Sequence, residues 1–277
     1  MLKQRLLVAL FGLPILAVII WFGEPWYTIL AVIWGLVCTF EFYGMVTRLK
    51  IKPLTILGLL FSPLFITSSH FSHSIIYLPL ILTTVVVLPL TLLLLQPKKE
   101  GAYSRWVWMV AGIIYISWLL HYLVAIRNGH TPLAISSIDS RNWIYYIFAT
   151  TFISDTLAFF LGRAIGKHHL APQVSPHKTW EGSLAGLFGA TLTSLLFTLP
   201  TPLALPLTCF QAVLLGLAVS IFGQTGDLVK SLLKRNMGVK DSSNFLPGHG
   251  GFLDRIDSVL FAGVIVYYYV LFAAQMS

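Results

Sequence analysis

Nine stretches of this chain are apolar over about the length that a helix needs to cross a lipid bilayer. They lie at Leu6–Phe22, Trp26–Val46, Leu54–Ser69, Ile75–Gln96, Trp106–Ile126, Trp143–Leu161, Leu184–Leu199, Phe210–Leu228 and Arg255–Ala274. Because lipid offers the backbone no hydrogen-bond partners, such segments fold as helices. The sequence therefore predicts an all-α, polytopic integral membrane protein in which residues 1–277 form a single membrane-embedded domain.

The charge content agrees with this prediction. Only 10% of the residues are charged, whereas a soluble domain carries about 25%. The net charge of +8 would suggest a nucleic-acid partner in a soluble protein, but here loop topology explains it and we expect no nucleic acid. Cys38 and Cys209 both lie in apolar segments, so no disulfide framework is expected.

The basic residues predict the orientation. Sixteen of the 18 lysines and arginines fall at the N-terminus or in every second loop, and positive charge stays in the cytoplasm. We therefore expect a cytoplasmic N-terminus, an external C-terminus and a location in the cell (inner) membrane. If Leu54–Ser69 did not span, two basic loops would fall on opposite faces, which argues that it does.

The most polar region is Ser231–Asp257, which combines several cations and acids with a glycine-rich turn at Gly248, Gly250 and Gly251. Its charged and polar members are Ser231, Lys234, Arg235, Lys240, Asp241, His249, Asp254, Arg255 and Asp257. A loop that only sets topology needs lysine and arginine, not acids and bare backbone as well. The composition suits a metal–phosphate site that faces the cytoplasm. We therefore expect residues 1–140 to be N-terminal helices and residues 141–277 to hold the catalytic helices and loops.

Asp227 and Asp254 are the candidate metal ligands. They are 27 residues apart, about 40 Å on one helix, so they can meet only if the chain turns back at Pro247–Gly251. We expect one helix to end near Asn236 and the next to begin near Asp254. Two carboxylates from facing helix ends could hold one divalent cation, and oxygen ligands beside phosphate favour Mg²⁺. The alternative is that Asp254 and Asp257 only stabilise a helix N-terminus.

Helical spacing places one polar stripe beside this acid, formed by Asp227, Lys230, Ser231 and Lys234. The stripe could follow a polyphosphate or could be an intrahelical ion-pair ladder. Gly223 and Gly226 thin the same helix just before Asp227, which would admit a neighbouring helix or a lipid head group.

A second polar region begins within the apolar segment Trp143–Leu161. Asp155 lies inside it, and an acid at membrane depth is a functional candidate by default, although Arg163 could simply neutralise it. The loop that follows supplies Arg163, Lys167 and Lys178 as candidate phosphate ligands. The alternative for this loop is a solvated topology determinant.

These two regions resemble the phosphatidate cytidylyltransferases, also called CDP-diacylglycerol synthases. The family signature runs Ser-x-x-Lys-Arg, four residues, Lys-Asp, then His-Gly-Gly, two residues, and Asp-Arg-x-Asp. The chain supplies Ser231, Lys234, Arg235, Lys240, Asp241, His249, Gly250, Gly251, Asp254, Arg255 and Asp257 at that spacing. The stretch from Ser154 to Gly182 is also similar to the family's second block. The N-terminal half matches in hydropathy, apart from Glu41 near an inner helix end.

The resemblance implies a reaction in phospholipid biosynthesis, in which CTP and phosphatidic acid give CDP-diacylglycerol and pyrophosphate. It implies Mg²⁺ held by Asp227 and Asp254, in some relatives with a second, monovalent cation such as K⁺, and it allows a homodimer. We expect Asp227, Asp254, Lys234, Arg235 and Asp257 to be catalytic. The expected substrate-binding residues are Ser231, Lys240, Asp241, His249, Arg255, Arg163, Lys167, Lys178 and Asp155.

Other classes fit less well. An ion-coupled transporter would explain Asp155 and the glycine-broken eighth segment, but the polar residues crowd one face rather than the bilayer midplane. A CDP-alcohol phosphotransferase needs an Asp-Gly-x-x-Ala-Arg block that the chain lacks. A lipid or polyprenol kinase of related fold would differ in its nucleotide preference. A non-enzymatic scaffold would not need this signature.

Overall fold

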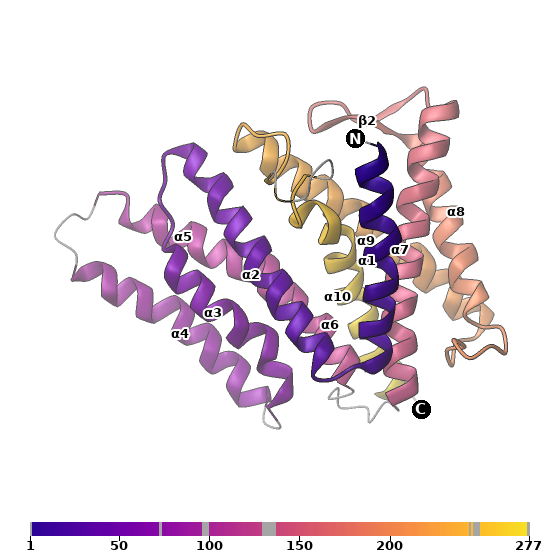
Figure 1. Cartoon of the computed structure of the whole chain (residues 1–277), viewed down its shortest axis with the longest axis horizontal. Helices are drawn as coiled ribbons and strands as arrows, with labels where there is room; N and C mark the ends of the chain where they lie inside the picture. Colours follow the sequence, from indigo (N-terminus) through magenta and orange to yellow (C-terminus); the bar gives the residue numbers. More distant parts are fainter. Residues whose placement is uncertain are drawn as a thin grey trace. The chain divides into compact units, whose positions relative to one another are not determined.

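The computed structural model of the chain describes residues 2–71, 74–95, 100–128, 137–243, 245 and 250–275. Each of the nine predicted segments is helical over most of its described length (Figure 1), although the helix predicted to end at Leu199 ends three residues earlier, at Leu196. The helices are α1 (Leu2–Phe22), α2 (Trp26–Val46), η1 (Thr47–Leu49), α3 (Thr55–Thr67), η2 (Ser68–His70), α4 (Ser74–Leu94), α5 (Ala102–Gly112), the π-helix η3 (Ile113–Trp118), α6 (Leu119–Asn128), α7 (Ser137–Ile165), α8 (Trp180–Leu196), α9 (Cys209–Asn236) and α10 (Leu253–Gln275). The helix ends expected near Asn236 and Asp254 are confirmed.

Six of the described helical stretches are long and apolar enough to cross a membrane. They are Trp26–Leu49, Ile76–Leu94, Ala102–Asn128, Asp139–Ile165, Cys209–Asn236 and Leu253–Ala273. The other three predicted spans fall on α1, α3 and α8. The class, an α-helical membrane protein, is supported, whereas the count of nine spans and the cytoplasmic N-terminus stay predictions.

The chain divides into two units. The first unit comprises Met1–His130 and Asn236–Arg255, and the second comprises Thr131–Arg235 and Ile256–Ser277. The chain therefore passes between the units three times: between His130 and Thr131, at the end of α9, and in the first turn of α10. The predicted division into residues 1–140 and 141–277 stays a prediction.

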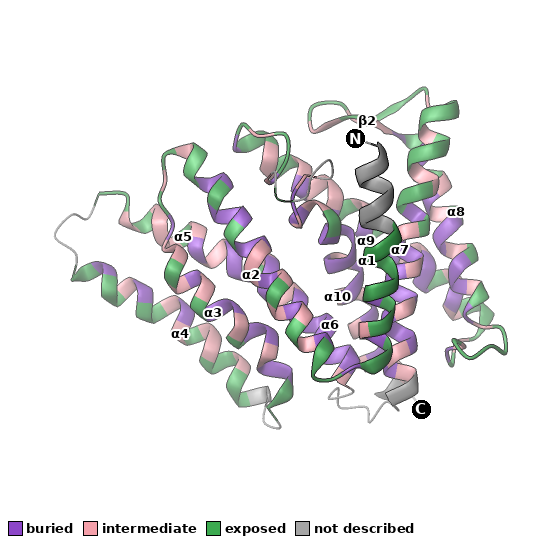
Figure 2. Cartoon of the chain, viewed as in Figure 1, coloured by how far each residue is buried: buried purple, intermediate pink, exposed green. Residues whose placement is uncertain are grey.

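The first unit is built around α2, which packs against α3, α5 and α6. Several buried polar groups between the helices of this unit have hydrogen-bond partners, as a dry interior favours. Tyr43 donates from its hydroxyl to the carbonyl of Met109 at 2.7 Å, and the hydroxyls of Ser117 and Ser62 are 2.7 Å apart. Figure 2 shows buried and exposed residues side by side along α2, α3 and α5, so each of these presents one face to its neighbours and another outward, whereas α6 is buried along nearly its whole length.

In the second unit α7 packs along α8. Thr179 ends the preceding strand and caps α8, because its hydroxyl accepts a hydrogen bond from the amide of Gly182 at 3.2 Å. A Cβ at Gly182 would lie 2.6 Å from the carbonyl oxygen of Ala158 and 2.9 Å from the Cα of Gly162. A residue without a side chain is therefore needed for the two helix backbones to come this close.

A short antiparallel hairpin connects α7 to α8 and was not part of the all-α prediction. Its strands are β1 (His169–Ala171) and β2 (Ser175–Thr179), paired with an irregularity between His169 and Ala171. The hairpin is small, but its strand β2 carries Lys178 to the carboxylate of Asp227 on α9.

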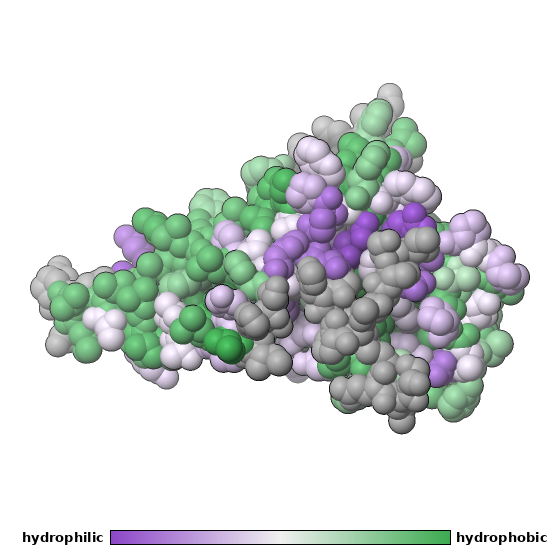
Figure 3. All heavy atoms as spheres, turned by 90° about the horizontal axis from the view of Figure 1, so that it is seen from below, coloured by the Kyte–Doolittle hydropathy of each residue, from purple (hydrophilic) through white to green (hydrophobic). Residues whose placement is uncertain are grey.

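Large apolar side chains are exposed on helices of both units, including Ile56 at 77%, Phe188 at 67% and Phe210 at 72%. Apolar residues also cover much of the face drawn in Figure 3. Exposed apolar surface on this scale is what lipid-facing helices present.

Candidate active site

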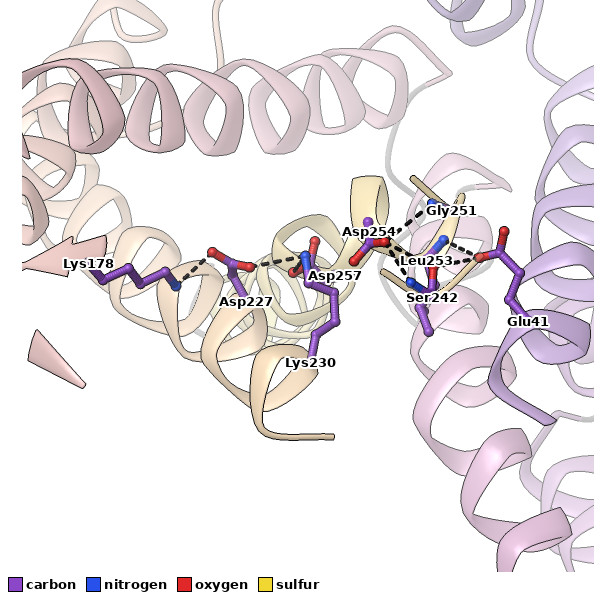
Figure 4. Close-up of polar contacts among 9 residues, drawn as sticks. All are labelled: Glu41, Lys178, Asp227, Lys230, Ser242, Gly251, Leu253, Asp254 and Asp257. Atoms are coloured by element: carbon purple, nitrogen blue, oxygen red, sulfur yellow. Dashed lines mark hydrogen bonds and ion pairs between the residues drawn. The ribbon is translucent and has the colours of Figure 1, made fainter. Parts of the chain in front are cut away.

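Asp227 of α9 lies between two lysines of the second unit (Figure 4). The ammonium of Lys178, on β2, is 2.7 Å from its Oδ2, and that of Lys230, one turn on along α9, is 3.0 Å from its Oδ1. The side chain of Asp227 remains 31% exposed. A partly accessible carboxylate that holds two cations is a site where a metal ion or a phosphate-bearing substrate could change the pairing.

Lys230 continues this arrangement into the interior. Its side chain is 7% exposed, and its ammonium also lies 2.6 Å from Oδ2 of Asp257, on α10, whose side chain is 5% exposed. A buried carboxylate of this kind needs a cation beside it. The result is an alternating row of charges, Lys178–Asp227–Lys230–Asp257, which we call the lysine–aspartate row.

Gly226 allows α10 to come this close to α9. A Cβ at this position would lie 2.7 Å from the carbonyl oxygen of Asp257 and 2.8 Å from the ring of Phe261. Of the two alternatives expected for the glycines before Asp227, Gly226 therefore admits a neighbouring helix, α10, whereas a Cβ at Gly223 would make only an ordinary contact, 3.6 Å from the carbonyl oxygen of Ser258.

Asp155 joins the same group of charges. From α7 its carboxylate interacts electrostatically with Asp227, Lys178 and Lys230. Arg163, considered above as its partner, is exposed in the last turn of α7. Three acids and two lysines, drawn from α7, β2, α9 and α10, therefore meet in the second unit.

Asp254 accepts hydrogen bonds from residues of the first unit. Its Oδ2 accepts from the amide of Ser242 at 3.0 Å, from the Ser242 hydroxyl at 3.0 Å and from the amide of Gly251 at 3.3 Å (Figure 4). The Ser242 hydroxyl also lies 3.0 Å from Oε2 of Glu41, on α2.

The remaining predicted residues lie around these groups. Ser231, Lys234 and Arg235 are in the last turns of α9, and Arg235 donates from Nε to the carbonyl of Val174 at 3.3 Å. Lys240, Asp241, Arg255 and Lys167 are exposed, and His249 lies outside the described residues.

Glu181 attaches the hairpin to α8. Its Oε1 lies 2.7 Å from Nδ1 of His168, and its Oε2 accepts from the His168 amide at 3.3 Å. The hydrogen bond from His168 lowers the pKa of Glu181 to about 2, so this carboxylate is ionised at neutral pH.

Two residues of interest were not among the predicted site residues. Lys230 is on the polar stripe that helical spacing identified, but its contact with Asp257 depends on how α10 packs. Glu41 was noted only as an acid near a helix end. The signal for Glu41 was its position in an apolar run, because a buried acid there needs partners.

No group of three or more His, Cys, Asp or Glu side chains in the described part of the chain could hold a metal ion. Mg²⁺ is usually bound by one or two carboxylates together with substrate phosphates and water. The carboxylates of Asp227 and Asp254 are ligands of this kind. Asp227 belongs to the second unit and Asp254 to the first, so their sharing of one ion stays a prediction.

Comparison with known proteins agrees with these observations. The chain matches the cytidylyltransferase family over residues 3–273. It is 35% identical to the phosphatidate cytidylyltransferase of Bacillus subtilis over 273 residues, which cover 96% of each chain. It is 37% identical to that of Brucella abortus over 164 residues, 58% of this chain and 56% of the relative. It is also 34% identical to the chloroplastic phosphatidate cytidylyltransferase 5 of Arabidopsis thaliana over 64% of this chain and 48% of the relative.

The match extends over nearly the whole chain, including the first unit, where the sequence resemblance was weakest. This chain belongs to the cytidylyltransferase family.

Proposed function

We propose that this protein transfers CMP from CTP to phosphatidic acid and forms CDP-diacylglycerol and pyrophosphate. The family match over residues 3–273 and the relatives named phosphatidate cytidylyltransferase support the reaction. Within the molecule, the observation that carries the proposal is the lysine–aspartate row, because its lysines and carboxylates suit a substrate rich in phosphate.

The reaction joins two anions. An oxygen of the lipid phosphate attacks the α-phosphorus of CTP, a new P–O bond forms, and the bond to the β-phosphate breaks so that pyrophosphate leaves with its electron pair. A phosphate monoester has a second pKa of about 6, so the nucleophile is already an anion in the cytoplasm. The protein therefore needs no strong general base, and its main task is to offset charge repulsion.

The cations of the second unit are suited to this task. Lys178 is held at Asp227 on the hairpin, and Lys234 and Arg235 follow on the last turns of α9. Phosphate oxygens and the carboxylate of Asp227 are both acceptors for the same ammonium groups. We infer that phosphates of CTP draw Lys178 into contact while Asp227 orients it.

Magnesium is the cofactor that we propose, with Asp227 and Asp254 as its protein ligands. When bound, it would supply positive charge to phosphate oxygens during the transfer. The row of cations and carboxylates supports a site of this kind, since Asp227 already attracts two ammonium groups.

We further propose that the N-terminus and the active site face the cytoplasm, where CTP is available. The distribution of basic residues supports this orientation. A topology reporter fused at Ser277 should report the external side, and one in the Lys98–Arg105 loop the cytoplasmic side. Ser277 and Lys98 lie outside the described residues, so both fusions are placed from the sequence. A cytoplasmic C-terminus would contradict the orientation.

The activity is tested with purified protein in detergent, phosphatidic acid, Mg²⁺ and one labelled nucleotide at a time. We expect CDP-diacylglycerol and pyrophosphate with CTP, and little product with ATP, GTP or UTP. Transfer of the γ-phosphate from ATP to a lipid would instead identify a lipid kinase. Absence of lipid product with every nucleotide would overturn the proposal.

A further inference from the structure

Glu41 is a buried acid in an apolar helix. It lies within α2, in the candidate membrane span Trp26–Leu49, and only 5% of the residue is exposed. A carboxylate removed from water is costly unless hydrogen-bond donors surround it. Its donors show what the residue does.

All four donors lie near the two ends of the segment that joins α9 to α10. This segment carries part of the family signature, and we call it the signature loop. The hydroxyls of Ser242 and Ser243 approach from the start of the loop, and the amides of Phe252 and Leu253 approach from its end. The amide of Phe252 is 3.0 Å from Oε1 and that of Leu253 is 2.9 Å from Oε2. One side chain of α2 therefore ties together two chain segments that are ten residues apart in the sequence.

The hydrogen bonds of Glu41 also extend to Asp254 through Ser242. The Ser242 hydroxyl lies 3.0 Å from Glu41 Oε2 and 3.0 Å from Asp254 Oδ2. A hydroxyl has one proton, so it is shared between the two carboxylates. The amide of Leu253, bound by Glu41, immediately precedes Asp254 in the chain. Both the backbone entering Asp254 and the group that orients its side chain are thus fixed by Glu41.

The glycines of the signature fit this arrangement. Gly250 has a φ of +79°, a conformation that favours glycine. A Cβ at Gly251 would lie 1.9 Å from the Ser242 hydroxyl and 2.5 Å from Glu41 Oε2. Gly251 is therefore needed for the backbone to lie against the two side chains that hold it.

We propose that Glu41 is a positioning residue of the cytidylyltransferase reaction: its carboxylate holds Ser242 and Ser243 together with Phe252 and Leu253 and thereby presents Asp254. The proposal rests on the proposed function, since Asp254 acts in that reaction. Glu41 itself touches no substrate. It acts as an acceptor supplied by one helix to the unpaired amides at the start of another.

Glu41→Gln is the informative variant. Each carboxylate oxygen of Glu41 accepts one backbone amide, so a glutamine in either orientation places its NH₂ group against an N–H donor. Glu24→Gln is the matched control. Glu24 is also an acid of the first unit, but it binds the Thr28 hydroxyl at 2.9 Å and lies 3.7 Å from His70, away from the signature loop.

The first measurement is hydrogen–deuterium exchange of purified protein, followed in peptides that cover residues 250–255. Glu41→Gln should speed exchange in these peptides by about tenfold or more, because the amides lose their acceptor. Peptides from α3 and α6 should keep their wild-type rates, and Glu24→Gln should exchange like wild type throughout. Equal exchange at residues 250–255 in both variants would overturn the proposal.

The second measurement is steady-state kinetics. Glu41→Gln should lower kcat by about 10²-fold, as small displacements of reacting groups do, while KM for phosphatidic acid changes less than about threefold. The Mg²⁺ concentration that gives half-maximal rate should rise. A loss of folded protein alone would lower the rate at every Mg²⁺ concentration in proportion, and that result would also overturn the proposal.

Ser243→Ala provides a milder variant in case Glu41→Gln does not fold. It removes one hydrogen-bond donor to Glu41 Oε1. We expect the same pattern of changes, with kcat lowered about tenfold relative to wild type. Failure of the proposed function is distinguishable, because wild-type protein would then make no CDP-diacylglycerol while the exchange result still tests the contacts. Active wild type with an unchanged Glu41→Gln variant would contradict the inference alone.

Discussion

The two units treat their acids in opposite ways. In the second unit, Asp227 and Asp257 are paired with the ammonium groups of Lys178 and Lys230. In the first unit, Glu41 and Asp254 accept from backbone amides and serine hydroxyls (Figure 4). Both groups contain signature residues, yet one is a row of alternating charges and the other is a pair of acids held by backbone amides and serine hydroxyls.

The difference indicates two kinds of work. An ammonium group on a long side chain can leave a carboxylate for a phosphate oxygen, so the pairing in the second unit can respond to an anionic substrate. An amide belongs to the backbone and cannot follow a ligand without moving the chain. We infer that the acids of the second unit hold the cations that offset phosphate charge during the reaction. The acids of the first unit hold the backbone in place.

The largest effect should follow from Asp227→Asn, which keeps the shape of the side chain and removes its charge. We expect the rate of CMP transfer to fall by about 10²–10³-fold, the usual cost of losing one electrostatic contact to a transition state. The protein should still fold, because Lys230 keeps Asp257 as its partner. Activity with CTP and phosphatidic acid, measured beside thermal melting, checks this. Asp139→Asn, which changes an acid of the second unit outside the row, is the control. Near-normal activity of Asp227→Asn would show that the negative charge of Asp227 is not needed for the reaction.

Asp254→Asn tests whether the two groups of acids meet in function. If Asp227 and Asp254 bind one Mg²⁺ ion, each single variant should lose about 10²–10³-fold, and the double variant should lose little more, because both act on the same ion. Magnesium-dependent rates of the three variants provide the measurement. Losses that multiply in the double variant would show that the acids act independently and would end the shared-ion proposal.

Much of this arrangement could be predicted from the sequence, for local reasons. The apolar runs predict the helices because their lengths match a bilayer. The end of α9 near Asn236 and the start of α10 near Asp254 follow from the breakers between them. The stripe that contains Asp227 and Lys230 follows from helical periodicity. These predictions depend on residues within one continuous stretch of the chain.

The contacts that the sequence did not predict join distant residues. Glu41 and Leu253 are 212 positions apart, and no periodicity relates them. Lys230 meets Asp257 because Gly226 lets α10 approach, which depends on packing. The hairpin that carries Lys178 was also missed, since a strand of five residues between charged and turn residues gives a weak pattern.

Lys230→Met sharpens the comparison by testing stability. It would leave Asp257 buried without this cation, and removing one partner of a buried ion pair costs about 3 kcal/mol or more. We expect a clearly lower melting temperature in detergent together with reduced activity. Ser231→Ala, a neighbouring polar change on α9, should melt close to wild type.

The double variant Lys230→Met, Asp257→Leu separates stability from chemistry. Replacing both members of a buried pair by apolar groups is often neutral, so the melting temperature should recover while activity stays low. Recovery of both would show that the pair is only structural. Recovery of neither would show that Asp257 has further partners that the row does not include.

The smallest effect should come from Glu181→Gln, because this acid, 24% exposed, pairs with a histidine that is 77% exposed, and ion pairs open to solvent contribute little to stability. His168 holds the folded pKa at about 2, below the ordinary value of 4.5. The stabilisation is therefore fully present above pH 4.5 and is lost as the pH falls toward 2. The melting difference between wild type and Glu181→Gln should be small at neutral pH and should shrink below pH 4.5. His168→Ala should reproduce it. A large melting difference at neutral pH would show that an ion pair open to solvent stabilises the protein as much as a buried one. That result would contradict the contrast between the acids of the two units.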